Sequence, residues 1–153
     1  MKKITVMAIC FVLTLSFSGC GKAELKLGKE VSTAEETTFD VSMDIVEGTV
    51  HPTGLTIRIS NNTNLEIDSG NANDFAIEAQ KDRKWYSIDI DERAITSEAM
   101  VFEGTRDVEI SWNDIYGQLP KGQYRIVKAF WPRSEDGACL DNQFCLSAEF
   151  SIE

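Results

Sequence analysis

The chain has 153 residues, with 15 lysine and arginine residues against 25 aspartate and glutamate residues, and a formal net charge of −10 at pH 7. A chain of this length has room for one hydrophobic core and one domain. The acidic balance disfavours nucleic-acid binding, because there is no basic field that could release counterions from phosphates. Anionic lipid headgroups would likewise repel the protein rather than recruit it by charge.

The first residues have the layout of a secretory signal. Two lysines precede an apolar run that ends at Phe17, and small residues follow up to Cys20. The apolar run is shorter than the roughly 20 residues that a membrane-spanning helix needs, and small residues after it favour cleavage. We therefore interpret this segment as a targeting signal that does not contribute to the fold.

The end of this segment, "FSGC", resembles a bacterial lipobox. The resemblance implies cleavage before Cys20 and attachment of diacylglycerol to its sulfur. We therefore predict a lipoprotein signal peptide at 1–19 and a lipid on Cys20 that anchors the protein to the cell membrane, on its extracytoplasmic face. Phe17 departs from the lipobox pattern, which has Leu, Val or Ile at this position, so an ordinary secretory signal is the alternative.

Residues 20–38 are predicted to form a lipidated flexible tether. The segment "GKAELKLGKEVSTAEETT" after Cys20 is rich in Lys, Glu, Ser and Thr and has no aromatic residue. As a flexible coil it would have an end-to-end distance on the order of 24 Å. The alternative is a first helix that begins at the pair Ser32 and Thr33.

From Phe39 onward the apolar residues recur with a period of two, which is typical of half-buried strands. In the strand at 123–131 either face could be the core, since Arg125 lies on one and Lys128 on the other. Strands are predicted at 39–45, 55–59, 75–80, 84–90, 106–112, 123–131 and 143–152, with a hairpin turn at "KDRK" (81–84). Short strands with frequent turn signals and no long amphipathic helix predict an all-β fold, a single antiparallel β-sandwich over 39–153.

The segment "WNDIYGQLPKGQYRIVKAFW" contains two glycines at the spacing of a phosphate-binding loop, Gly117 and Gly122. Gln123 and Tyr124 stand where that loop requires lysine and Ser/Thr, and a strand rather than a helix follows. The pattern "LPKGQY" instead predicts a tyrosine corner, in which the hydroxyl of Tyr124 bonds back to the backbone just upstream. The segment therefore indicates a fold and no reaction.

Four stretches, "GLTIRISNNTN", "KWYSI", "WNDIYGQLPKGQYRIVKAF" and "SAEFSI", resemble the bacterial immunoglobulin-like domain of small lipoproteins of Gram-positive bacteria. The resemblance covers roughly 39–152. It implies an immunoglobulin-like sandwich in the cell envelope, and it brings no enzymatic activity and no catalytic residue.

Cys139 and Cys145 flank a five-residue stretch in "CLDNQFC". In an oxidising exterior such a pair is expected to form a disulfide, which would contribute about 2.4 kcal/mol by loop entropy. Two free thiols are one alternative. A metal site is another, although this spacing is not that of a zinc site.

Residues with catalytic potential are sparse. The single histidine, His51, precedes Pro52 at a predicted turn, and no nucleophile or metalloprotease motif is present. Carboxylates such as those in "DIDE" and "SEDG" could form a weak calcium site, but the spacing of an EF-hand loop is absent. We expect no enzyme, no cofactor and no metal.

Function is therefore expected in a loop. Trp131, at a strand end before Pro132, is the candidate contact for a partner, and 132–145 is the most distinctive loop. Because loops carry recognition on a rigid scaffold, the sequence predicts a non-enzymatic protein-interaction module of the cell envelope, with an unidentified protein partner. The alternative is a loop-mediated inhibitor of an extracellular protease.

Overall fold

A computed structural model describes residues 25–32, 37–90 and 100–153. The predicted signal peptide at 1–19 and the predicted lipid-attachment residue Cys20 lie outside the described residues. Within the described ranges, no helix has the length and apolar character needed to cross a membrane.

The described chain is almost entirely β-structure, as the alternating apolar pattern predicts. A single short helix, α1 (Asn113–Tyr116), lies among the strands of the described part. These strands are β1 (Leu27–Val31), β2 (Val41–Ile45), β3 (Gly54–Asn61), β4 (Ile67–Asp68), β5 (Ala76–Lys81), β6 (Lys84–Ile88), β7 (Val101–Phe102), β8 (Gly104–Ser111), β9 (Gly122–Pro132) and β10 (Phe144–Ile152).

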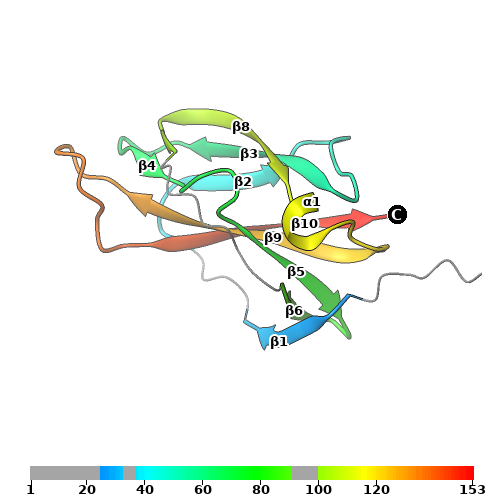
Figure 1. The fold of residues 1–153 in the computed structure, drawn as a ribbon. Helices are drawn as coiled ribbons and strands as arrows, with labels where there is room; N and C mark the ends of the chain where they lie inside the picture. Colours follow the sequence, from blue (N-terminus) through cyan, green and yellow to red (C-terminus); the bar gives the residue numbers. More distant parts are fainter. Residues whose placement is uncertain (1–24, 33–36, 91–99) are drawn as a thin grey trace, which may run out of the picture.

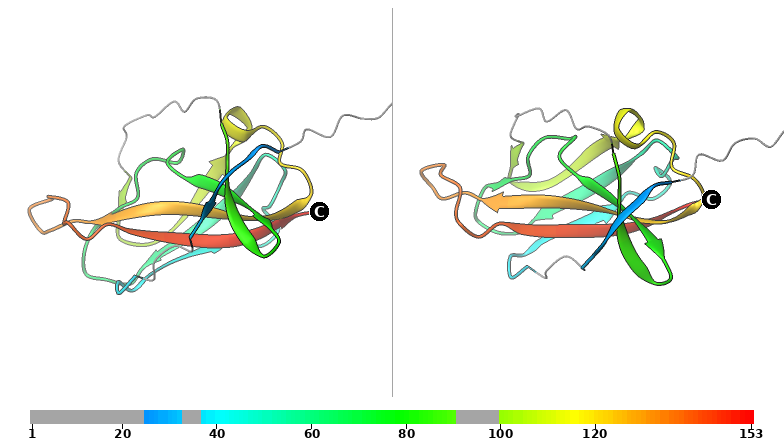
Figure 2. Two further views of the ribbon diagram at one scale, coloured as in Figure 1. Left: turned by 90° about the horizontal axis from the view of Figure 1, so that it is seen from below. Right: turned by 60° about the horizontal axis from the view of Figure 1, so that its bottom comes forward.

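Two antiparallel sheets form the fold (Figure 1). The smaller has the order β2-β3-β8, and the larger has the order β1-β6-β5-β9-β4-β7, with β10 on the other edge of β9. β5 and β4 share one edge of β9: β5 pairs with Tyr124 to Val127, and β4 pairs with Trp131 and Pro132. Figure 2 shows β5, β6 and β1 crossing obliquely beside the long β9–β10 pair. The predicted immunoglobulin-like β-sandwich is confirmed.

The core lies between the two sheets and is built from the inward residues of each strand. Phe150 stacks on Trp112, with ring centroids 5.4 Å apart, and on Tyr124 at 5.7 Å. Phe130 stacks on Phe144 at 5.5 Å. Full burial of a large apolar side chain contributes about 1.5–3 kcal/mol, so this aromatic cluster is a major source of stability.

Three hydrogen bonds fix the connection from β8 to β9. The hydroxyl of Tyr124 donates to the carbonyl oxygen of Pro120 at 2.7 Å, which is the contact expected of a tyrosine corner. The indole N–H of Trp112 and the backbone N–H of Leu119 both donate to the carbonyl oxygen of Pro52, at 2.8 and 2.9 Å. Burial raises the pKa of Tyr124, so the hydroxyl keeps its proton and remains a donor.

The turn predicted at 81–84 joins β5 to β6. Lys81 lies opposite Lys84, and the two residues between them, Asp82 and Arg83, have φ angles of 52° and 64°. Positive φ at both central residues is the signature of a type I′ turn, whose twist matches that of the flanking strands.

The predicted tether at 20–38 is wrong over Leu27–Val31, which form β1 along the edge of β6. The guanidinium of Arg125 secures the end of this strand: its Nη2 donates to the carbonyl oxygen of Ser32 at 2.9 Å. Its Nε donates to Glu78 at 2.5 Å. The ring of Trp85 covers the guanidinium, with 4.7 Å between Cζ and the ring centroid. Arg125 is therefore buried on the outer face of the sheet.

Candidate functional site

The hairpin of residues 133–143, between β9 and β10, projects beyond the rest of the sandwich (Figures 1 and 2). The N–H of Gly137 donates to the carbonyl oxygen of Ser134 at 2.8 Å, and the N–H of Ser134 donates to that of Ala138 at 2.9 Å. Gly137 has φ of 82°, which favours glycine at this point of the turn. Main-chain hydrogen bonds therefore hold the tip in one conformation.

The predicted disulfide between Cys139 and Cys145 is wrong, because neither residue is in a disulfide. Cys139 lies opposite Arg133, whereas Cys145 lies opposite Ala129 in the ladder of β10 with β9. Four residues along a strand span about 13 Å, and a disulfide requires Cα atoms within about 7 Å. The sequence spacing alone could not show this offset, since it depends on the register of the hairpin.

Arg133 anchors the base of the hairpin to β4. Its Nη2 donates to Oδ2 of Asp68 at 2.8 Å, and Oδ1 of the same carboxylate accepts the N–H of Gly70 at 2.9 Å. Asp68 is 7% exposed. The hydrogen bond to Asp68 raises the pKa of Arg133, so the guanidinium keeps its proton. The hairpin is therefore joined to the core by a largely buried ion pair.

Trp131, the predicted partner contact, lies at the base of the hairpin and pairs with Asp68 of β4. It is half-buried, as are Ala129 and Val127, which precede it at alternate positions of β9. Alternate residues of a strand share a face, so these three side chains form a partly exposed apolar strip on the outer face of the larger sheet. The alternating pattern of β9 places these residues on one face, but the sequence did not show whether that face lies outside or in the core.

Lys128 is a buried cation that the sequence analysis left unassigned. It is 1% exposed, and its Nζ donates to the carbonyl oxygens of Asn71 at 2.7 Å and Asp74 at 2.9 Å. Burial lowers the pKa of Lys128 from 10.5 to about 8. The side chain lies on the core face of β9 with Tyr124 and Phe130, and it fixes the loop between β4 and β5.

A shallow groove of about 250 Å³ lies beside the hairpin. Its polar lining includes one guanidinium, already paired with Asp68, and three exposed carboxylates. None of these carboxyl groups is buried, and burial is what shifts the pKa of a carboxyl group toward the range of a general acid or base. The groove is lined by Asn64, Leu65, Glu66, Glu103, Arg133, Ser134 and Glu135. In the part of the chain that the structure describes, no group of three His, Cys, Asp or Glu side chains is placed to hold a metal ion.

His51 is exposed in the connection between β2 and β3, where it forms an isolated bridge with Gly54. The structure does not bring it together with Trp131, Cys139 or the hairpin. It therefore forms no common site with the residues that the sequence analysis selected.

The two antiparallel sheets and the exposed hairpin define an immunoglobulin-like module. Residues 35–151 match the family model of the bacterial Ig-like domain, and the chain belongs to this family. No curated protein and no solved structure shows significant similarity to the chain. The family is generally non-enzymatic, and an Ig-like domain suggests a protein-interaction module.

Proposed function

We propose that this protein is an extracytoplasmic lipoprotein, anchored through a lipid on Cys20, whose Ig-like domain binds a protein of the cell envelope through the 133–143 hairpin. The observation that carries the proposal is the placement of the hairpin relative to the start of β1. β1 begins at the end of the sandwich that also holds the C-terminus, and the hairpin projects from the opposite end (Figures 1 and 2).

The length of the anchor segment supports this orientation. Residues 21–26 separate Cys20 from the start of β1 at Leu27. Even fully extended, this segment spans only about 25 Å. A lipid on Cys20 would therefore hold the domain close to the membrane by one end and leave the hairpin directed away from it.

The composition of the hairpin suits protein recognition. Trp131 at its base is a half-buried aromatic side chain, the type that contributes most energy in interfaces. Glu135, Asp136 and Asp141 are exposed on the hairpin and would form the polar part of the interface. The tip is ordered by its own hydrogen bonds, so little conformational entropy would be lost on binding.

The experiment replaces residues 133–141 with Asn-Gly, so that Pro132 and Asn142 flank a two-residue turn in the native register. A matched control replaces Asp82 and Arg83 with Asn-Gly in the β5–β6 turn. Envelope proteins are crosslinked to the full chain and to each variant. One specific protein that is crosslinked to the full chain and to the control variant should be missing with the hairpin variant. Recovery of the same proteins with both variants would refute the role of the hairpin.

The anchor has a separate test. Cys20→Ala should move the protein from the membrane fraction to the soluble fraction, because no acyl chain is then attached. Cys139→Ala, which removes the thiol of the hairpin, is the control, and this variant should remain in the membrane fraction. Membrane association of the Cys20 variant would contradict the lipid anchor.

Inhibition of an extracellular protease is the second candidate, and it is favoured by the ordered, exposed tip of the hairpin. An inhibitor presents a preformed loop to the enzyme, and rigidity reduces the ordering cost of binding. Stoichiometric loss of activity in a panel of extracellular proteases would support this candidate. A flat titration against every enzyme of the panel would exclude it.

A further inference from the structure

β8 has an edge that no strand covers within the described residues. It pairs with β3 along its whole length, from Gly54 opposite Ser111 to Asn61 opposite Gly104, and with no other described strand. It lies at the border of the smaller sheet (Figure 1). The open edge of a strand presents a row of N–H and C=O groups to which another chain can bind.

The hydrogen-bond pattern identifies the groups that face this edge. The N–H of Trp112 donates to the carbonyl oxygen of Thr53 at 3.0 Å, one pair beyond the end of the β3–β8 ladder. In an antiparallel ladder only alternate residues bond to a given neighbour, so Val108 and Ile110 bond to β3. The groups that face the open edge belong to Thr105, Asp107, Glu109 and Ser111, whose side chains are all exposed.

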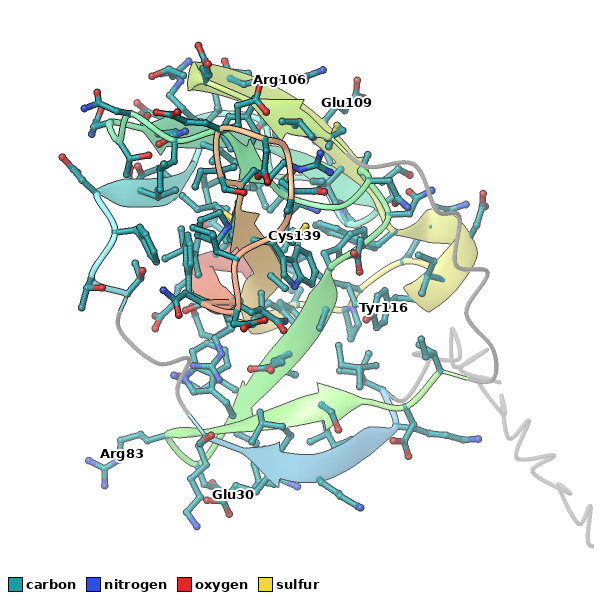
Figure 3. The ribbon with its side chains drawn as sticks, turned by 90° about the vertical axis from the view of Figure 1, so that its left-hand side faces the viewer. Glu30, Arg83, Arg106, Glu109, Tyr116 and Cys139 are labelled. Carbon is teal, nitrogen blue, oxygen red and sulfur yellow. The ribbon has the colours of Figure 1, made fainter. Side chains whose placement is uncertain are left out.

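A groove of about 420 Å³ adjoins one end of this edge. Glu109 is the only carboxylate of its lining, His51 contributes an imidazole ring, and Thr49, Thr53, Thr56 and Ser111 contribute hydroxyl groups. Glu109 lies on the outer side of β8 (Figure 3) and forms no ion pair with a described residue, whereas Asp107 is paired with Arg58 through two bonds of 2.7 Å. A lysine or arginine side chain fits this groove, because its stem can lie on the strand while its charge meets Glu109.

A second copy of the chain does not fit the edge. In a symmetric antiparallel pair, residues of the same face stand opposite each other, so the outward residues of β8 would meet their equivalents. Every register that pairs most of the strand places Asp107 or Glu109 opposite a carboxylate of the other copy. Like charges at opposite positions destabilise a strand pair, so the occupant is a different chain, and the carboxylate of Glu109 favours a cationic one.

We propose that the open edge of β8 binds an extended cationic segment of another protein by strand addition, with a lysine or arginine side chain in the groove beside Glu109. Main-chain hydrogen bonds would supply affinity, and the side chain in the groove would supply specificity. A segment with lysine at alternate positions places its charges on the face of Asp107 and Glu109. Arg58, the cation opposite Asp107 on this face, is already paired with that carboxylate, and Arg106 is on the other face.

The probe is a fluorescein-labelled peptide of eight residues in which lysine and threonine alternate, with a peptide of alternating glutamate and threonine as its control. Fluorescence anisotropy is measured with the full chain in detergent micelles. The lysine peptide should bind and the glutamate peptide should not. Glu109→Lys should weaken binding about tenfold, whereas Asp44→Lys, the same charge change on β2 of the same face, should change it less than twofold.

Amide hydrogen exchange distinguishes strand addition from attraction by charge. The bound lysine peptide should slow exchange at Thr105, Asp107, Glu109 and Ser111, and it should leave Val108, which already bonds to β3, unchanged. Absence of binding overturns the proposal, as does binding without this alternate protection. Equal weakening by the two lysine substitutions also overturns it, because the site would then be the whole acidic surface.

This site is independent of the hairpin function. β8 belongs to the smaller sheet and the hairpin to the larger, so the Asn-Gly variant of the hairpin should bind the lysine peptide as the unmodified chain does. Loss of peptide binding in that variant would assign the peptide to the hairpin and refute the β8 site.

Discussion

Replacing Lys128 with methionine removes a buried ammonium group and leaves a side chain of similar length and flexibility. Lys128 is 1% exposed, and its ammonium donates to the carbonyl oxygens of Asn71 and Asp74 at 2.7 and 2.9 Å. The substitution therefore removes both a charge that is costly to bury and two hydrogen bonds that tie the β4–β5 loop to β9. The dependence of stability on pH separates these two effects, since only the charge titrates.

The magnitude follows from the pKa of Lys128, which burial lowers from 10.5 to about 8 in the folded chain. Between these two values the unfolded chain binds more protons than the folded one, so the free energy of unfolding rises with pH. One pKa unit corresponds to about 1.4 kcal/mol, which makes the complete gain about 3 kcal/mol. Below pH 8 both states are protonated and this contribution is constant.

The assay is urea unfolding of the wild type and of Lys128→Met at pH 7, 8, 9 and 10. Exposed lysines and tyrosines titrate alike in both proteins, so their effects cancel in the difference. The free energy of unfolding of the wild type, relative to the variant, should rise by about 2–3 kcal/mol between pH 7 and pH 10. A difference that stays flat or falls would refute the lowered pKa of Lys128, because the folded chain would then hold this proton at least as tightly as the unfolded chain.

Three further predictions concern the ion pairs, the corner and the cysteine. Arg125→Met should destabilise the fold by about 3–5 kcal/mol in urea unfolding, because it leaves the carboxylate of Glu78 largely buried without its partner. Arg58→Met breaks an exposed pair and should destabilise the fold far less; equal losses would contradict the role of burial. Tyr124→Phe should cost about 1 kcal/mol, because its hydrogen bond to a backbone carbonyl is lost, and an unchanged midpoint would show that this bond contributes nothing. Cys139→Ser should leave the thermal midpoint unchanged, and dithiothreitol should not lower that of the wild type; a drop on reduction would show that a disulfide had formed.

The strands that the sequence predicted share a local pattern. Alternation in 39–45 or 55–59 is readable without knowledge of any partner, because each apolar residue of a half-buried strand faces the core in turn. The three strands that were missed lack this pattern. β4 and β7 have two residues each, and β1 contains a register irregularity between Leu27 and Glu30 that interrupts the alternation.

The candidate site was predictable only in part. Trp131 and the 132–145 loop could be selected because a tryptophan before a proline ends a strand and a polar loop follows. The prediction that the two cysteines pair was wrong. Their separation of six positions in the sequence does not reveal that one lies opposite Arg133 and the other opposite Ala129. The open edge of β8 could not be predicted, since an edge is defined by the absence of a neighbour.

The sequence by itself determined the all-β class and the position of most strands, because alternation and turn residues act over a few neighbouring positions. It could also suggest the tyrosine corner, whose hydrogen bond joins Tyr124 to Pro120, four residues apart. Only the tertiary structure decided how Arg125 and Lys128 are both buried in β9. Each cation is stabilised by oxygen atoms from chain segments more than 45 residues away, Glu78 and Ser32 for one and Asn71 and Asp74 for the other, and no local pattern records such partners.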